Sequence, residues 1–177
     1  MILFNGFSMG DPGAAESPDI GKSSAENIAF YASNAELHLN LRHLTMLYGS
    51  AEKMYRNLCA ISDEIEESHA PMENKEAELE GCQDAIKLVG DVMRDTKYYV
   101  ELGSMLDEYR TLGREIMREC ITPERSAELN SAMRGLEQKF KSKEQFASYL
   151  LAYGIGGYYI NLMRDAEKFI LKYAMLE

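Results

Sequence analysis

The residue pattern in this chain that comes closest to a metal site is one Glu-x-x-His pair, Glu66 with His69. On a helix this spacing places a carboxylate and an imidazole on one face, and di-metal carboxylate bundles use the pair twice, with two further glutamates. Here the pair occurs once, beside Pro71, and neither His38 nor His43 belongs to such a pair. We therefore interpret Glu66 and His69 as a solvated helix end, and we keep a metal-dependent helical-bundle enzyme only as a remote alternative.

Other catalytic patterns match by letter alone. Ser8 lies in a Gly-x-Ser-x-Gly segment, but a serine nucleophile of that type needs a buried strand before it and a helix after it. No Asp-x-Asp-x-Asp-Gly loop is present, which excludes an EF-hand. Cys59, Cys82 and Cys120 are scattered singly, which is typical of a reducing compartment and not of a zinc site. We expect no catalytic residue, no metal and no cofactor.

The elements that position these residues follow from a heptad pattern. From Phe30 to Ile65, apolar residues recur at spacings of alternately four and three residues. Two positions of this pattern are polar, Asn34 and Ser62. The members are Phe30, Leu37, Leu41, Leu44, Tyr48, Ala51, Tyr55, Leu58 and Ile65. An average spacing of about 3.5 residues keeps one seam facing a partner helix. The pattern predicts one long helix from a Ser23–Glu26 capping box to about Ser68, with a soft spot at Gly49.

A second long helix is predicted from about Glu73 to Cys120, after a break at residues 69–72 that contains Pro71. Its expected seam consists of Leu79, Cys82, Ile86, Val89, Met93, Val100, Leu106, Tyr109, Leu112 and Ile116. The phase of this seam slips near Gly103, which predicts a stutter or a kink. Because the two helices are nearly equal in length, an antiparallel hairpin is the simplest arrangement.

The C-terminal residues 121–177 predict three shorter helices. The first begins at Thr122–Pro123 and runs to about Lys141; a Ser142–Gln145 capping box starts the second, and the third follows a glycine-rich break at residues 154–157. The predicted fold is therefore all-α, a helical bundle. It consists of an irregular N-terminal arm (1–22), a long antiparallel hairpin (23–120) and three shorter helices packed on that hairpin (121–177).

Charge limits the class of partner. The net charge is −10, with 22 acidic and 11 basic residues in 1–120 against 7 acidic and 8 basic residues in 121–177. A nucleic-acid binder needs a basic face, so we expect no nucleic-acid partner. We also expect no membrane span, because no segment is long and apolar enough. The start of the chain lacks a basic region, so no cleavable signal peptide is expected; a cytoplasmic protein or a specialised secretion route remain open.

Four sets of residues are candidates for protein–protein contact. Two of them lie on the predicted hairpin: an acidic tip and a second apolar stripe, which recurs every seven residues and implies more than one neighbour. The third set is a group of tyrosines, and the fourth is the apolar part of the N-terminal arm. The tip comprises Glu64, Glu66, Glu67, Glu76 and Glu78; the stripe Leu47, Met54 and Ile61; the tyrosines Tyr153, Tyr158 and Tyr159; the arm Ile2, Leu3, Phe4 and Phe7.

Two main function classes follow from these surfaces. The first is a non-enzymatic assembly or scaffold protein, such as a component of a phage particle or a secretion apparatus, that forms homo-oligomers or binds a protein partner. The second is a soluble acidic adaptor, chaperone or inhibitor that binds one protein through the tyrosines or the acidic tip. The solution mass of the chain distinguishes them, because only the first class requires self-association.

Overall fold

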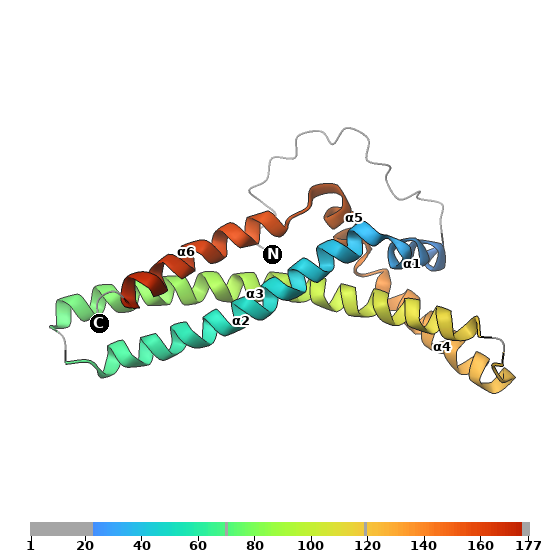
Figure 1. Ribbon diagram of the computed structural model, residues 1–177, viewed down its shortest axis with the longest axis horizontal. Coiled ribbons are helices and arrows are strands. Elements are labelled where there is room, and N and C mark those ends of the chain that lie inside the picture. Colours follow the sequence, from blue (N-terminus) through green and yellow to red (C-terminus); the bar gives the residue numbers. More distant parts are fainter. Residues whose placement is uncertain (1–22, 70, 119, 175–177) are drawn as a thin grey trace.

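The computed structural model describes residues 23–69, 71–118 and 120–174. Within these ranges the chain forms six α-helices and no strand, which confirms the all-α prediction. The helices, labelled in Figure 1, are α1 (Ser24–Ser33), α2 (Ala35–Glu67), α3 (Met72–Ile116), α4 (Pro123–Phe140), α5 (Glu144–Tyr153) and α6 (Gly156–Ala174). The N-terminal arm predicted for residues 1–22 lies outside the described residues.

The first helix begins where the capping box predicts. The Ser23 side chain accepts a hydrogen bond from the Glu26 backbone, and the Ser23 backbone N–H donates to Glu26 Oε2 at 2.8 Å. The prediction of one helix as far as Ser68 is wrong, because the chain leaves helical geometry at Asn34 (φ −79°, ψ 109°). Gly49, the expected soft spot, lies inside an uninterrupted α2.

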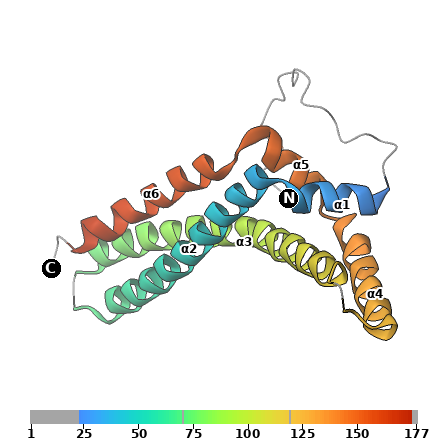
Figure 2. The same ribbon diagram turned by 45° about the vertical axis from the view of Figure 1, so that its right-hand side comes forward.

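Helices α2 and α3 lie side by side in opposite directions, joined by a short connection at one end of the molecule (Figures 1 and 2). The side chains that α2 buries all belong to the heptad seam, whereas Tyr48 is half-buried and Tyr55 is exposed. The buried members are Leu37, Leu41, Leu44, Ala51, Leu58 and Ile65. The seam is therefore a real packing face, although its Tyr positions lie at its edge.

The buried face of α3 agrees with the expected seam at some positions, such as Cys82 and Val89, and is shifted by one residue at others. Near the tip it consists of Cys82, Ala85, Val89, Val92, Thr96 and Tyr99. Ile86 and Met93, which were expected in the seam, are only partly buried. The small Ala85 and the polar Thr96 look unsuited to a core, but the Thr96 hydroxyl donates to the Val92 carbonyl at 2.7 Å, which satisfies it within its own helix.

No break marks the stutter or kink predicted for α3 near Gly103, because the helix continues through this residue. Leu102 and Gly103 are both buried there, so the buried face is wider at this point. At this point α2 approaches closely, since a Cβ built on Gly103 would lie 3.5 Å from Leu41 Cβ. The two halves of α3 have different neighbours: α6 packs along the tip half, and α4 along the other (Figure 2).

The C-terminal helices follow the predicted order with one corrected cap. Thr122 Oγ1 accepts from the Arg125 backbone N–H at 3.2 Å and starts α4. The capping box predicted at Ser142 is wrong, because its hydroxyl donates to the Lys139 carbonyl at 2.8 Å and Lys143 takes the N-cap position. Gly154 ends α5 with a left-handed φ of 53°, after which α6 runs back along the hairpin toward its tip.

Candidate functional site

Two side chains that could take part in catalysis, His38 and Cys82, have contacts within the fold. In the ranges that the structure describes, no group of three or more His, Cys, Asp or Glu residues is placed to hold a metal ion. His38 Nε2 lies 2.9 Å from the Ala32 carbonyl, and its Nδ1 lies 3.4 Å from an Asp107 carboxylate. The buried Cys82 thiol donates to the Leu58 carbonyl at 3.3 Å, and burial raises its pKa, which disfavours the reactive thiolate.

The second apolar stripe has a neighbour inside the same chain. Leu47, Met54 and Ile61 are partly buried against the hydrophobic core, and α6 packs on α2 as well as on α3. The contact between α6 and α3 is close at Gly81, where an added Cβ would lie 2.9 Å from Cε2 of the Phe169 ring. The stripe, a candidate for protein–protein contact in the sequence, is therefore partly covered within its own chain.

The acidic tip lies at the connection between α2 and α3, and we define it by Glu64, Glu66, Glu67, Glu76, Glu78 and the exposed Met72. Its nearest base, Lys75, donates to the backbone carbonyls of Glu66 and Ser68 at the C-terminal end of α2. A cation there stabilises the helix dipole. As far as the described residues go, none of the five glutamates forms an ion pair, so the tip presents its negative charge to solvent.

The three tyrosines selected from the sequence separate into two groups. Tyr159 is buried, and burial raises the pKa of its hydroxyl well above the usual value, while Tyr153 and Tyr158 are exposed. Tyr153 also packs on Tyr149, with ring centroids 4.7 Å apart. Tyr159 thus belongs to the core, and only Tyr153 and Tyr158 are available for contact with a partner.

Tyr158 lines a groove of about 380 Å³ between α6 and α3. On the α3 side lies Asp95, whose Oδ1 is 3.5 Å from Arg94 Nε and whose buried Oδ2 has no hydrogen-bond partner. Burial raises the pKa of the Asp95 carboxyl, the nearby Asp91 adds to this, and Arg94 opposes it. The groove therefore disfavours the ionised form of Asp95.

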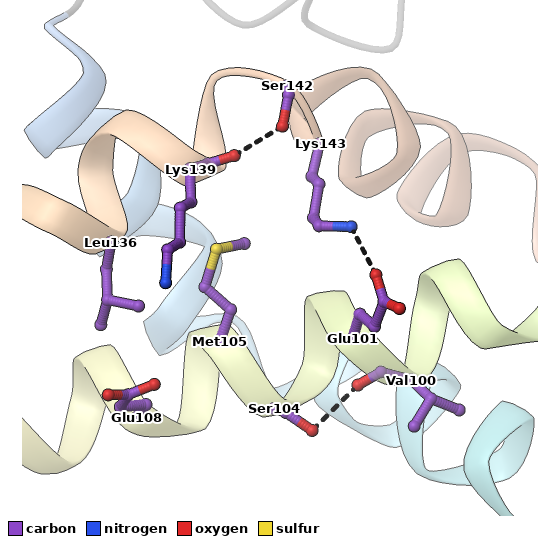
Figure 3. Close-up of a pocket in the computed structure, with 9 residues that line it drawn as sticks. All are labelled: Val100, Glu101, Ser104, Met105, Glu108, Leu136, Lys139, Ser142 and Lys143. Atoms are coloured by element: carbon purple, nitrogen blue, oxygen red, sulfur yellow. Dashed lines mark hydrogen bonds and ion pairs between the residues drawn. The ribbon is translucent and has the colours of Figure 1, made fainter.

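A second cleft, of about 420 Å³, lies between α3 and the turn that joins α4 to α5 (Figure 3). Lys143 closes one side through an ion pair with Glu101 at 3.0 Å, and its Nζ lies 5.7 Å from the centroid of the Tyr98 ring. Figure 3 shows the Lys139 side chain extending from α4 toward α3. Sequence reasoning missed this cleft, because its two walls, 100–108 and 136–143, are far apart in the chain.

This cleft offers binding groups but no activated nucleophile. The Ser104 hydroxyl donates to the Val100 carbonyl at 3.1 Å, and the Ser142 hydroxyl donates to the Lys139 carbonyl. Neither serine has the histidine or carboxylate base that serine catalysis requires. The arrangement suits contact with another molecule better than covalent chemistry.

Sequence reasoning also missed a basic surface at the far end of α3. Arg110, Arg114 and Arg118 are spaced four apart and exposed, and Met117 beside them is 87% exposed. We call these four residues the arginine elbow, because α3 turns there into α4 (Figure 1). The four-residue spacing of these arginines can be read from the sequence. Because residues 1–120 carry a net acidic charge, no basic surface was expected there.

The last candidate, the apolar arm with Ile2, Leu3, Phe4 and Phe7, lies outside the described residues. In the helices that are described, no segment has the length and hydrophobicity needed to cross a membrane. Comparisons of the chain with protein-family models, with curated proteins and with solved structures found no match. The function must therefore be inferred from the residues and surfaces described above.

Proposed function

We propose that the protein is a non-enzymatic helical assembly or scaffold protein, of the kind that builds a phage particle or a secretion apparatus, and that it acts through protein–protein contacts. The observation that carries this proposal is the outer face of α2. Leu39 and Met46, seven residues apart on that face, are 53% and 65% exposed. Apolar side chains that recur at a seven-residue spacing on the outer face of a helix favour contact with a neighbouring molecule.

The shape of the molecule supports the same proposal. Helix α3 has 45 residues, which corresponds to a length of about 68 Å. The chain builds an elongated body around it, with α2 and α6 along one half and α4 at the other (Figure 2). Such a body has long faces and two separate ends, which suit a repeating structural unit.

Absolute mass measured by light scattering after size exclusion tests this proposal. We expect a discrete or growing oligomer above the 20.0 kDa of one chain across a concentration series at two salt concentrations. The variant Leu39→Ser/Met46→Ser should reduce the mass. The matched control, Ile160→Ser/Leu171→Ser, changes two similarly exposed side chains on α6 and should not. A 20.0 kDa species at every concentration would contradict self-assembly.

A second candidate function, a soluble acidic adaptor or inhibitor that binds one protein, is favoured by the unpaired carboxylates of the acidic tip. Exposed charge of one sign accelerates encounter with a basic partner and makes the rate depend on salt. This candidate requires a monomer that forms a complex of fixed stoichiometry with its partner. Replacing Glu64, Glu66, Glu67, Glu76 and Glu78 by glutamine should slow the association, and an unchanged rate would rule out a role for the tip.

A further inference from the structure

We infer that the arginine elbow of one copy binds the acidic tip of a second copy, so that copies join head to tail. This inference deepens the proposed assembly function and rests on it: it names the partner as the same chain and names both surfaces. Three features of the molecule support it: charged side chains at each end with no ion pair among the described residues, an exposed apolar side chain beside them, and the opposite positions of the two ends.

The described residues offer no ion pair to the arginines of the elbow. Arg125, on the first turn of α4, lies 2.9 Å from Glu115 and 3.1 Å from Glu128 and so takes up two nearby carboxylates. Among the residues with described positions, Arg110, Arg114 and Arg118 form no ion pair. Arg110 and Arg114 lie on successive turns of α3, and Arg118 follows just after the helix ends at Ile116. Guanidinium groups placed in this way offer several donors that fit carboxylates.

The acidic tip has the complementary arrangement. Glu64, Glu66 and Glu67 occupy the last turn of α2, and Lys75, the base nearest to them, is bound to backbone carbonyls. Carboxylates at the C-terminal end of a helix lie against the negative end of its dipole, which is an unfavourable place for them. A cationic partner would relieve that repulsion.

Each end also exposes one methionine. Met72 at the tip is 77% exposed, and Met117 at the elbow is 87% exposed. A flexible thioether side chain adapts to many surfaces, and an apolar contact inside a charged rim is the usual arrangement of a protein interface. The two ends therefore match in apolar as well as in charged groups.

The positions of the two surfaces exclude pairing within one chain. Tip and elbow lie at opposite ends of α3 (Figures 1 and 2), separated by most of its length of about 68 Å. A contact between different surfaces at opposite ends is heterologous, and it continues from copy to copy until a ring closes or a filament forms. A second copy is the partner because one chain supplies both charges.

Charge reversal with complementary rescue tests this inference. The elbow variant is Arg110→Glu/Arg114→Glu/Arg118→Glu, and the tip variant is Glu64→Lys/Glu66→Lys/Glu67→Lys. In about 50 mM salt, where exposed charges are weakly screened, each variant alone should associate roughly a hundredfold more weakly than the wild-type chain, because like charges then meet. An equimolar mixture of the two should recover the large species, which also shows that both variants are folded.

The matched control, Lys97→Glu/Lys139→Glu/Lys141→Glu, makes the same change in net charge at exposed positions away from the elbow. It should assemble like the wild type. Loss of assembly in this control, or no rescue in the mixture, would overturn the head-to-tail contact. If the wild-type chain assembles and both end variants assemble equally well, this inference alone is overturned. A wild-type monomer at every concentration would overturn the proposed function as well.

Cross-linking provides an independent measurement. Cys120 is exposed next to the elbow, so the variant His69→Cys places a second thiol at the exposed tip. A short bismaleimide should convert this variant into a ladder of trimers and higher species. In the wild-type chain the exposed Cys120 of one copy would face a tip without a thiol, so this contact should give no cross-linked ladder. An identical pattern for both chains would contradict the proposed contact.

Discussion

The side-chain oxygen of Asn34 accepts a hydrogen bond from the backbone N–H of Leu37 at 3.0 Å. This contact caps α2 directly after α1 ends, and the backbone N–H of Asn34 in turn donates to the Tyr31 carbonyl at 3.2 Å. Leu37 is fully buried. Asn34 therefore ends one helix, starts the next and fixes the point at which the first core side chain of α2 enters the bundle.

The variant Asn34→Ala should lower the free energy of unfolding by about 1 kcal/mol, because alanine cannot accept the hydrogen bond from the first turn of α2. Asn34→Asp keeps an acceptor at the same position and should retain most of the stability. Urea unfolding followed by circular dichroism measures both. Equal stability of Asn34→Ala and the wild type would show that the cap contributes nothing.

The same residue explains why the first helix was predicted incorrectly. Asn34 occupies a heptad position, and a polar residue within a heptad seam is also typical of a continuous coiled coil. Local sequence cannot separate that case from an N-cap; the choice depends on the packing of α1. Tyr31 of α1 lies 5.5 Å, between ring centroids, from Phe140 of α4, and its hydroxyl lies 2.6 Å from Ser148 Oγ.

The helix starts were predictable where a second local signal accompanies the N-cap residue, such as Glu26 after Ser23 or Pro123 after Thr122. The face of α3 was less predictable, because hydrophobicity favours Ile86 over Ala85 while close packing in a three-helix contact favours the smaller residue. The surfaces were predictable in part. The acidic tip is contiguous in sequence around one turn, whereas the cleft beside Lys143 combines residues that only tertiary structure brings together.

Two glycine substitutions should separate helix propensity from packing. Gly49→Ala adds a methyl group in open space within α2 and should stabilise the fold by about 0.5–1 kcal/mol, because alanine is the better helix former. Gly81→Ala gains the same propensity but pushes against the Phe169 ring. We expect it to be less stable than Gly49→Ala in urea unfolding.

Combining Gly81→Ala with Phe169→Leu provides the control for this explanation. The smaller side chain removes the ring from the position of the new methyl group, so the pair should lose less stability than the two single variants added together. Simple additivity would show that the Phe169 ring does not limit residue 81.

Removal of residues 1–22 should reduce self-association, because the apolar side chains Ile2, Leu3, Phe4 and Phe7 are predicted to contact a neighbouring subunit. Light scattering compares the truncated chain with the full chain at equal concentration. The substitution Phe4→Ser/Phe7→Ser in the full chain controls for chain length. An unchanged particle size in both variants would exclude this part of the chain from the interface.

The partly buried carboxyl of Asp95 gives a prediction about pH. Because burial raises its pKa in the folded chain, the folded state binds the proton more tightly than the unfolded state does. Asp95 is therefore compatible with the fold while it is protonated. The free energy of unfolding that Asp95 costs the protein grows as the pH rises from the ordinary carboxyl range, near pH 4, through the raised pKa.

The variant Asp95→Asn removes this ionisation and should raise the free energy of unfolding at pH 7 by about 1 kcal/mol, which corresponds to about 2–4 °C in Tm. The gain should shrink toward pH 4, where the wild-type carboxyl is increasingly protonated. Asp91→Asn is the matched control, because Asp91 lies 2.8 Å from Arg94 and is more exposed. Calorimetry across this pH range should show stabilisation for Asp95→Asn only; destabilisation of both at pH 7 would mean that the Asp95 charge is favourable in the folded chain.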